Sequence, residues 1–268
     1  MRDLTFYIWA DTHYGYQQRF AGDDLRARII DQMNALPGWP YPRRLGGTVD
    51  SPDFVLLCGD AVDGQPGQGE PEMTWFRYFT QRLRFPQVEA MGNHDTDPVY
   101  STYFRDTYGG LSHSFDRQGV HFICLNARYD ASEGGSLGQE ELVFLQEDLA
   151  SCGAEVPVIL FVHSRLDRTQ NGTDALCLLR DHRTLLIASA HIHKPAVFQL
   201  DGIDCVDAGQ CRDHPIDAEC GRVLYVCRLT DSRLTAAPWR WDLRDWEHGQ
   251  RWADPDVVAG RLTLDREL

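Results

Sequence analysis

The sequence predicts an α/β fold in which parallel strand–helix units are followed by antiparallel hairpins. Short apolar runs of strand length alternate with amphipathic stretches of helix length, which is the pattern of parallel units. Three pairs of apolar runs are joined by short turn sequences, and two of these pairs come late in the chain. At 268 residues the chain is long enough to bury a full core as one large domain.

The expected strands of the parallel part are short and buried. They cover Leu4–Ala10, Phe54–Cys58, Val88–Met91, Pro157–Val162 and Thr184–Ser189. Three helices are expected between or beside them, at 71–85, at Gln139–Ala150 and near 173–182. In the second of these helices apolar residues recur at 142, 145 and 149, which places them on one face.

Turn residues mark the antiparallel part. The three expected hairpins pair Leu111–Phe115 with Val120–Asn126, Ala196–Leu200 with Ile203–Val206, and Val223–Leu229 with Leu234–Trp239. The second of them is joined by Asp201-Gly202, a strong two-residue hairpin signal.

Two segments rich in proline and glycine, 37–52 and 64–71, are expected to be loops. After Trp239 the chain is rich in tryptophan and charge and shows little periodicity. We therefore expect one catalytic domain over residues 1–239 and a C-terminal tail, 240–268, packed on that domain. No internal repeat and no second compact domain is visible in the sequence.

The charge and composition of the chain disfavour nucleic acid and membranes as binding partners. A formal net charge of -14 argues against a large nucleic-acid surface, which requires clustered lysine and arginine. The two loops carry only Arg43 and Arg44 as basic residues, so nucleic acid is not the expected substrate. No apolar stretch approaches membrane-spanning length, and we expect no membrane partner. Oligomeric state is left open.

The cysteines bear on the expected compartment. There are eight of them, and no C-x-x-C pair occurs. Most stand singly in apolar patterns, so we expect buried free thiols and a cytoplasmic protein, in agreement with an N-terminus that shows no export signal. A bridge or a minor metal site remains an alternative for the four late cysteines at 205, 211, 220 and 227.

Five short blocks of potential metal ligands occur in order along the chain. They are Asp11-Thr12-His13, Gly59-Asp60-Ala61-Val62-Asp63-Gly64, Gly92-Asn93-His94-Asp95, His163 and His191-Ile192-His193. Aspartate, histidine and asparagine suit divalent ions of intermediate hardness, and nearly every block directly follows an expected strand. Because α/β folds assemble sites from the loops at strand ends, the blocks predict a two-metal hydrolytic centre, with phosphate esters as the expected substrates.

This order of blocks resembles the calcineurin-like metallophosphoesterases, a group that includes purple acid phosphatases, cyclic-nucleotide phosphodiesterases and certain nucleases. The resemblance covers roughly residues 4–229, and the part from Tyr103 to the His163 strand looks most like the small bacterial cyclic-nucleotide phosphodiesterases and related phosphatases. It implies a four-layer α/β/β/α sandwich of two mixed sheets flanked by helices, with the metal site at the C-terminal ends of strands.

The resemblance also implies individual roles for the residues of the blocks. One metal ion would be held by Asp11, His13 and His193, and the other by Asn93, His163 and His191, with Asp60 bridging both. His94 would be the general acid that protonates the leaving oxygen, with Asp95 orienting its ring. Asp63 is expected to end the strand-to-loop turn and to bond a backbone amide or a ligand histidine.

The implied reaction is in-line attack on phosphorus by a hydroxide that bridges two divalent metal ions. The expected ligands suit Mn, Fe, Zn and Ni alike. Tyrosine is absent from the blocks, so a purple ferric site is not expected. The substrate is expected to be a small phosphomonoester or phosphodiester. A non-catalytic scaffold on the same fold and a nuclease remain alternatives, and the presence of His94 favours the enzyme.

Three further residues are candidates for substrate contacts. Arg165 lies beside His163 and is the first candidate for a phosphate contact. Arg128 follows another strand at the same expected edge, as does Tyr129, and His214 lies in a late loop that could reach the cleft. One departure from the family pattern is Ala190, where the family usually has glycine before the last histidine pair; alanine there is strained only if the position requires a positive φ.

Overall fold

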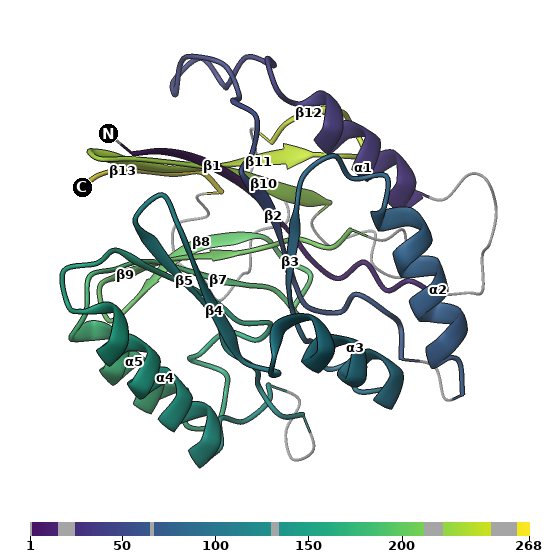
Figure 1. Ribbon diagram of the computed structural model, residues 1–268. Helices are drawn as coiled ribbons and strands as arrows, with labels where there is room; N and C mark the ends of the chain where they lie inside the picture. Colours follow the sequence, from purple (N-terminus) through teal and green to yellow (C-terminus); the bar gives the residue numbers. More distant parts are fainter. Residues whose placement is uncertain (1, 16–24, 65–66, 130–133, 212–221, 248–261) are drawn as a thin grey trace.

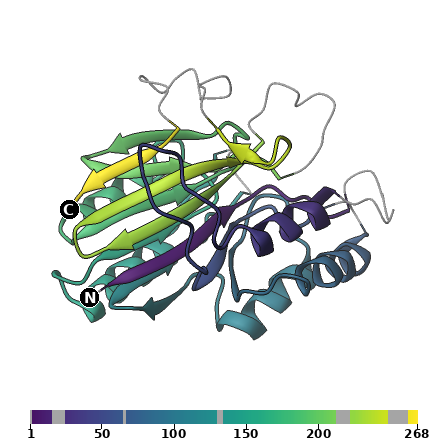
Figure 2. The ribbon, with the colours of Figure 1, turned by 90° about the horizontal axis from the view of Figure 1, so that it is seen from above.

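The computed structural model describes residues 2–15, 25–64, 67–129, 134–211, 222–247 and 262–268. Two mixed β-sheets lie face to face, and helices cover the outer face of each sheet (Figure 1). The predicted four-layer α/β/β/α sandwich is therefore confirmed. Both ends of the described chain lie at the same end of the first sheet (Figure 2), where the backbone amides of Arg2 and Leu268 both bond to the turn at 231–232.

The first sheet contains seven strands within the described residues, in the order β12–β11–β10–β1–β2–β3, with β13 also paired to β11. They are β1 (Asp3–Trp9), β2 (Phe54–Cys58), β3 (Gln87–Ala90), β10 (Val223–Thr230), β11 (Arg233–Arg240), β12 (Asp245–Trp246) and β13 (Leu264–Glu267). The strands β1, β2 and β3 are parallel, and β10 joins β1 in the antiparallel sense.

The second sheet has six described strands in the order β4–β5–β6–β7–β9–β8. They are β4 (His113–Arg117), β5 (Val120–Cys124), β6 (Val158–Phe161), β7 (Thr184–Ser189), β8 (Ala196–Leu200) and β9 (Ile203–Asp207). The strands β5, β6, β7 and β9 are parallel, and the two edge strands pair with their neighbours as the predicted hairpins.

Alternating side chains of the central strands explain the layering. On β1, Phe6 and Ile8 point between the sheets, whereas Tyr7 and Trp9 pack toward the helices of the first sheet. A strand buried on both faces reads as a continuous apolar run, which is why the sequence predicted it directly. The helices on this outer face are α1 (Leu25–Ala35), α2 (Gly69–Thr80) and α3 (Pro98–Tyr108). The outer face of the second sheet is covered by α4 (Gln139–Cys152) and α5 (Gly172–Arg180).

The helices α1 and α3 were not predicted, although the sequence around α3 contains helix-capping residues. The Asp97 side chain accepts a hydrogen bond from the backbone amide of Val99, Pro98 opens the helix, and Gly109 ends it in the left-handed conformation. This capping pattern identifies the helix better than its weak apolar periodicity does. Its position matters, because α3 begins directly after the block that contains Asn93.

The C-terminal segment contributes strands to the first sheet. Trp246 of β12 pairs with Trp239, and Leu264 of β13 pairs with Ala236, so both strands extend the sheet through β11. The division into a domain of residues 1–239 and a tail stays a prediction. Among the helices of the described residues, none combines the length and apolar character needed to cross a membrane. The seven cysteines in the described residues are free thiols, and Cys220 lies outside them.

Candidate metal centre

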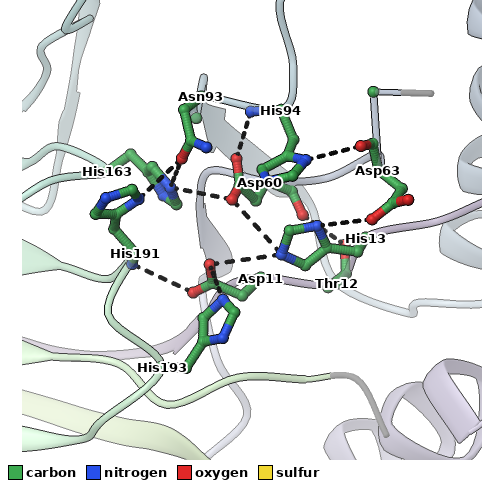
Figure 3. A network of polar contacts seen from close by, with 12 residues as sticks. Asp11, Thr12, His13, Asp60, Asp63, Asn93, His94, His163, His191 and His193 are labelled. Carbon is green, nitrogen blue, oxygen red and sulfur yellow. Dashed lines mark hydrogen bonds and ion pairs between the residues drawn. The ribbon is translucent and has the colours of Figure 1, made fainter. Parts of the chain in front are cut away.

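The five blocks meet at one edge of the sandwich, where the two sheets adjoin (Figure 3). Each block directly follows a parallel strand: β1, β2 and β3 in the first sheet, and β6 and β7 in the second. The carboxyl ends of parallel strands point the same way, so their loops converge at this edge. The structure thus brings together every residue that was expected to bind metal.

One group of potential ligands consists of Asp11, His13 and His193. Oδ1 of Asp11 lies 3.1 Å from Nε2 of His193 and 3.8 Å from Nε2 of His13. On the far side of the His13 ring, Nδ1 lies 3.3 Å from Oδ1 of Asp63. An outer oxygen at Nδ1 fixes the ring so that Nε2 faces the other two side chains, as is usual for a histidine that binds metal.

A second group consists of Asp60, His163 and His191, with Asn93 between the two histidines. Oδ1 of Asn93 lies 3.1 Å from Nε2 of His163 and 2.8 Å from Nδ1 of His191. The His163 ring is oriented in the same way as His13, because its Nδ1 lies 2.7 Å from the carbonyl oxygen of Cys58. The amide oxygen of Asn93 and the two ring nitrogens therefore point to a common position.

Asp60 belongs to both groups. Its Oδ2 lies 3.2 Å from Nε2 of His163 and 3.5 Å from Nε2 of His13, while Oδ1 accepts a hydrogen bond from the backbone amide of His94 at 2.9 Å. Figure 3 shows this carboxylate between His13 on one side and the pair His163 and Asn93 on the other. A carboxylate in this position is suited to be shared by two cations.

The backbone at the site is held in conformations that L-residues rarely adopt. Asp11, His13, Asp60, His191 and His193 all have positive φ, between 42° and 75°. Such residues cost free energy and persist only where the surrounding fold enforces them, and they gather at functional sites. Ala190 does not adopt a positive φ, so the alanine at this position brings no strain of that kind.

Two glycines allow the blocks to approach each other. At Gly59, where φ is +85°, a Cβ would lie 2.5 Å from Nδ1 of His163. At Gly92 a Cβ would lie 2.1 Å from Oδ1 of Asp60. Only glycine permits these contacts, so both glycines of the motifs serve the packing of one ligand against the loop of another.

Two buried carboxyl groups of the site, those of Asp11 and Asp60, have lowered pKa values. Burial raises the pKa of Asp11, but the neighbouring His193 and His13 outweigh it and hold that pKa well below its usual range. The pKa of Asp60 is likewise lowered, since His163 and His13 outweigh the effect of burial. Two ionised carboxylates in an interior site require compensating positive charge, and against the opposing effect of burial Asp60 and Asp11 raise the pKa of His163 to about 9.

The ring of His191 is available as a neutral ligand. Burial and the charge of His163 lower the pKa of His191 to about 4, so its imidazole is neutral at pH 7. Oδ1 of Asp11 is buried and accepts no hydrogen bond of good geometry from the described residues. Carboxylate, imidazole and amide groups with such unused acceptor atoms are the donor set of a divalent transition metal, so the site fits the metal ions that the sequence predicted.

His94 lies beside the cluster, and its ring orientation differs from the prediction. Its Nδ1 donates to the backbone carbonyl of Asp63 at 2.7 Å, and its ring centroid lies 4.6 Å from that of His13. The carboxylate of Asp95 instead accepts from the backbone amides of Ala61, Val62 and Gly92. The prediction that Asp95 orients the His94 ring is therefore wrong.

Asp95 has a structural role that its sequence position did not reveal. The bonds from Ala61 and Val62 join the loop after β3 to the loop after β2, which carries Asp60, and the bond from Gly92 closes Asp95's own loop. Burial, reinforced by the charge of Asp60, raises the pKa of Asp95 to about 7. Asp63 agrees better with its prediction, since its carboxylate contacts the expected ligand His13.

The expected substrate contacts are less well supported. Arg165 is 6% exposed, forms an ion pair with Asp167 at 2.7 Å and lies over the ring of Phe198, and neither partner belongs to the cluster. Arg128 is paired with Glu140 and Glu141. His214 lies outside the described residues. Neither arginine is therefore placed in the metal cluster.

Tyr129 is a neighbour of the cluster whose contacts could not be foreseen. Its ring centroid lies 6.0 Å from that of His163 and 6.2 Å from that of His191, and its hydroxyl lies 3.2 Å from the hydroxyl of Ser164. It follows β5, one strand outward from His163. The available signal was its place just after a strand at the active edge.

Comparisons with known proteins agree with this geometry. The family model of the calcineurin-like phosphoesterases matches residues 4–195. The chain is 31% identical to serine/threonine-protein phosphatase CPPED1 of Bos taurus over 140 residues, covering 46% of this chain and 43% of that protein. With the Mus musculus protein of the same name it is 34% identical over 113 residues, covering 37% and 35%. The alignments thus span less than half the length of these relatives.

Solved structures share the fold at low sequence identity. GAP50, described as the anchor in the inner membrane complex of Plasmodium, is 11% identical with a TM-score of 0.63, covering 99% of this chain and 88% of its own. Purple acid phosphatase PPD1 from yellow lupin (Lupinus luteus) is 14% identical with a TM-score of 0.62, covering 92% and 53%. Since the family model spans well over half of the sequence, the chain belongs to the calcineurin-like phosphoesterase family.

Proposed function

We propose that this protein hydrolyses phosphate esters of small molecules with the help of two divalent metal ions. The observation that carries the proposal is the shared carboxylate of Asp60, whose Oδ2 faces His13 in one ligand group and His163 in the other. A site for a single ion needs no second set of histidines on the far side of its carboxylate. Two cations a few ångströms apart do need an anion between them.

The residues divide into two ligand sets. Asp11, His13 and His193 would hold one ion, and Asn93, His163 and His191 the other, with Asp60 common to both. When bound, the two ions would supply Lewis-acid charge to the phosphoryl group and lower the pKa of a water molecule so that it attacks at neutral pH. The strained and interlocked loops hold the ligand atoms in place before substrate arrives.

His94 would supply the proton for the leaving oxygen. Because its Nδ1 donates to the fixed carbonyl of Asp63, the ring leaves Nε2 as the nitrogen that can carry a proton to the substrate. The ring lies beside His13 and therefore next to the place where the phosphoryl group would be bound. A positioned histidine of this kind acts as a general acid once Nε2 is protonated.

A scaffold function is the main alternative, because GAP50 shares this fold and is described as an anchor. The full set of ligand atoms around Asp60, together with His94, favours catalysis in the present chain. A phosphatase or phosphodiesterase acting on small molecules is preferred to a nuclease, since the net charge of -14 disfavours a nucleic-acid surface.

The proposal is tested by measuring hydrolysis of a monoester, phenyl phosphate, and of a diester, diphenyl phosphate. The protein is supplied with Mn²⁺, Fe²⁺, Zn²⁺ or Ni²⁺. We expect turnover with at least one ion, and the ratio of the two activities distinguishes a phosphatase from a phosphodiesterase. A chelator is expected to abolish turnover, and Mn²⁺ or another of these ions to restore it. No turnover of either ester with any of the four ions would favour the scaffold.

A further inference from the structure

A cavity of about 500 Å³ lies between α3, the start of β4, the segment after β5 and the first turn of α4. It is lined by Arg105, Leu111, Ser112, Asn126, Arg128, Glu140, Glu141 and Phe144, and it is called the Arg105 pocket below. The volume is that of a site for a small organic group. None of its lining residues belongs to the metal cluster.

Two polar side chains of the Arg105 pocket have no hydrogen-bond partner among the described residues. The guanidinium of Arg105 forms no hydrogen bond or ion pair with any described residue. The side-chain amide of Asn126 also lacks a partner within the described chain, although the residue is only 6% exposed. Only the backbone amide of Asn126 is engaged, donating to the hydroxyl of Ser112 at 3.0 Å. Polar groups buried to this extent nearly always have a hydrogen-bonding partner, so an unpartnered amide lining a pocket points to a ligand.

Arg105 is the uncompensated charge of the pocket. Arg128 is held by Glu140 at 2.7 Å and by Glu141 at 2.9 Å, so its own charge is already balanced. Glu141 also accepts from the backbone amide of Gly138 at 2.9 Å, and the side chain of Glu140 is 86% exposed to water. Both carboxylates therefore have donors or solvent of their own, and the exposed guanidinium of Arg105 has water around it but no acidic partner among the described residues.

The register of the second sheet places this pocket beside the metal centre. Cys124 at the end of β5 pairs with Phe161 at the end of β6, and the amide of Leu125 continues the ladder by donating to Phe161 at 3.0 Å. Asn126 lies two residues beyond the end of β5, and His163 lies two residues beyond the end of β6, so both follow the ends of adjacent strands at the same edge. From Asn126 the chain continues to Tyr129, whose ring packs near His163.

The helix α3 makes a second connection between the pocket and the site. It begins at Pro98, shortly after Asn93 and His94, and Arg105 lies two turns along it, about 10 Å from its start at 1.5 Å per residue. A substrate with its phosphoryl group at the metal centre would thus present to Arg105 a group several bonds away from phosphorus, on the leaving-group side.

We infer that the Arg105 pocket binds a second anionic group of the substrate, a carboxylate or a phosphate carried by the leaving group. Arg105 supplies the charge, the amide of Asn126 and the hydroxyl of Ser112 supply neutral donors, and Phe144 and Leu111 cover the carbon skeleton. The preferred substrates are then phosphate esters of small acidic compounds. This inference rests on the proposed phosphoesterase function.

Matched substrates test the inference. We would measure kcat/KM for phenyl phosphates whose para position carries carboxymethyl, phosphonomethyl or neutral carbamoylmethyl, because the methylene group keeps the leaving-group acidity similar. The wild-type protein is expected to prefer at least one anionic ester over the neutral ester by roughly tenfold, the scale of one charge-assisted hydrogen bond. Arg105→Ala should remove most of that preference, Arg105→Glu should reverse it, and Asn126→Ala should weaken it.

Arg44→Ala provides the charge-matched control, because Arg44 is exposed in the 37–52 loop and lies outside the pocket. It should keep the wild-type preference, and thermal unfolding checks that each variant is folded. If Arg105→Ala loses the preference for only one of the two anionic esters, that ester identifies whether the pocket recognises a carboxylate or a phosphate. Equal rates for all three esters, or a preference that survives Arg105→Glu, would overturn the inference while turnover of the neutral ester still supports the phosphoesterase. No turnover of any ester would contradict the proposed function itself.

Discussion

Replacement of Asp60 by alanine is expected to remove bound metal and activity together. Its Oδ2 lies within 3.5 Å of histidine nitrogens from both ligand groups, so its loss takes an anionic ligand from each ion and leaves the repulsion between the ions unbalanced. We expect kcat to fall by roughly 10³-fold or more, the scale seen when a central electrostatic group of an active site is removed. Metal content and phenyl phosphate hydrolysis would be measured on the same samples.

Two variants provide the comparison for Asp60→Ala. His193→Ala removes a ligand from only one group and should lose less metal. Asp53→Ala removes a carboxylate that pairs with Arg117 outside the metal cluster, and it should keep both metal and activity. If Asp60→Ala retained two ions per chain, Asp60 would not be the shared ligand.

Replacement of His94 by alanine is expected to affect activity without a matching loss of metal. The loss of a general acid typically costs about 10² to 10⁴ in rate, and the cost grows with the basicity of the leaving group. The variant should therefore be crippled on alkyl phosphates. It should be much less affected on nitrophenyl phosphate, because nitrophenolate departs without a proton. Rates on both esters and the metal content of each sample would be measured.

The control for His94→Ala is His182→Ala, since His182 lies outside the metal cluster, two residues after the end of α5. It should leave both rates unchanged. His94 also occurs in a candidate ligand group with His13 and Asp60, so the metal measurement decides between two roles. Loss of an ion would make His94 a ligand, and equal losses on both esters with the metal retained would exclude it as the acid.

The sequence predicted the strands and the convergence of the metal ligands because both depend on local pattern. Strands buried on two faces are continuous apolar runs, as in Phe54–Cys58, and their bounds were predicted closely. The parallel arrangement of these strands then places the residues that follow them at one edge. Asp11 and His191, both expected ligands, are 180 residues apart in the chain and yet lie in contact for this reason.

Other features depend on contacts that no local pattern contains. The helix α1 was not predicted because its amphipathic periodicity is weak, and it is stabilised by burial of Ile29, Ile30 and Met33 against the first sheet. Two of the bonds of Asp95 come from backbone amides of a different block, those of Ala61 and Val62, whereas sequence adjacency suggested the neighbouring ring of His94. The pairing of Arg165 with Asp167 is local, but its stacking on Phe198 is set by the fold.

The requirement for two ions is tested most directly by titrating metal-free protein with Mn²⁺ while bound metal and phenyl phosphate hydrolysis are both recorded. The two ligand sets around Asp60 predict that two ions bind per chain and that activity follows occupancy of the second. Full activity with one ion per chain, or activity that persists after complete metal removal, would contradict the two-metal centre.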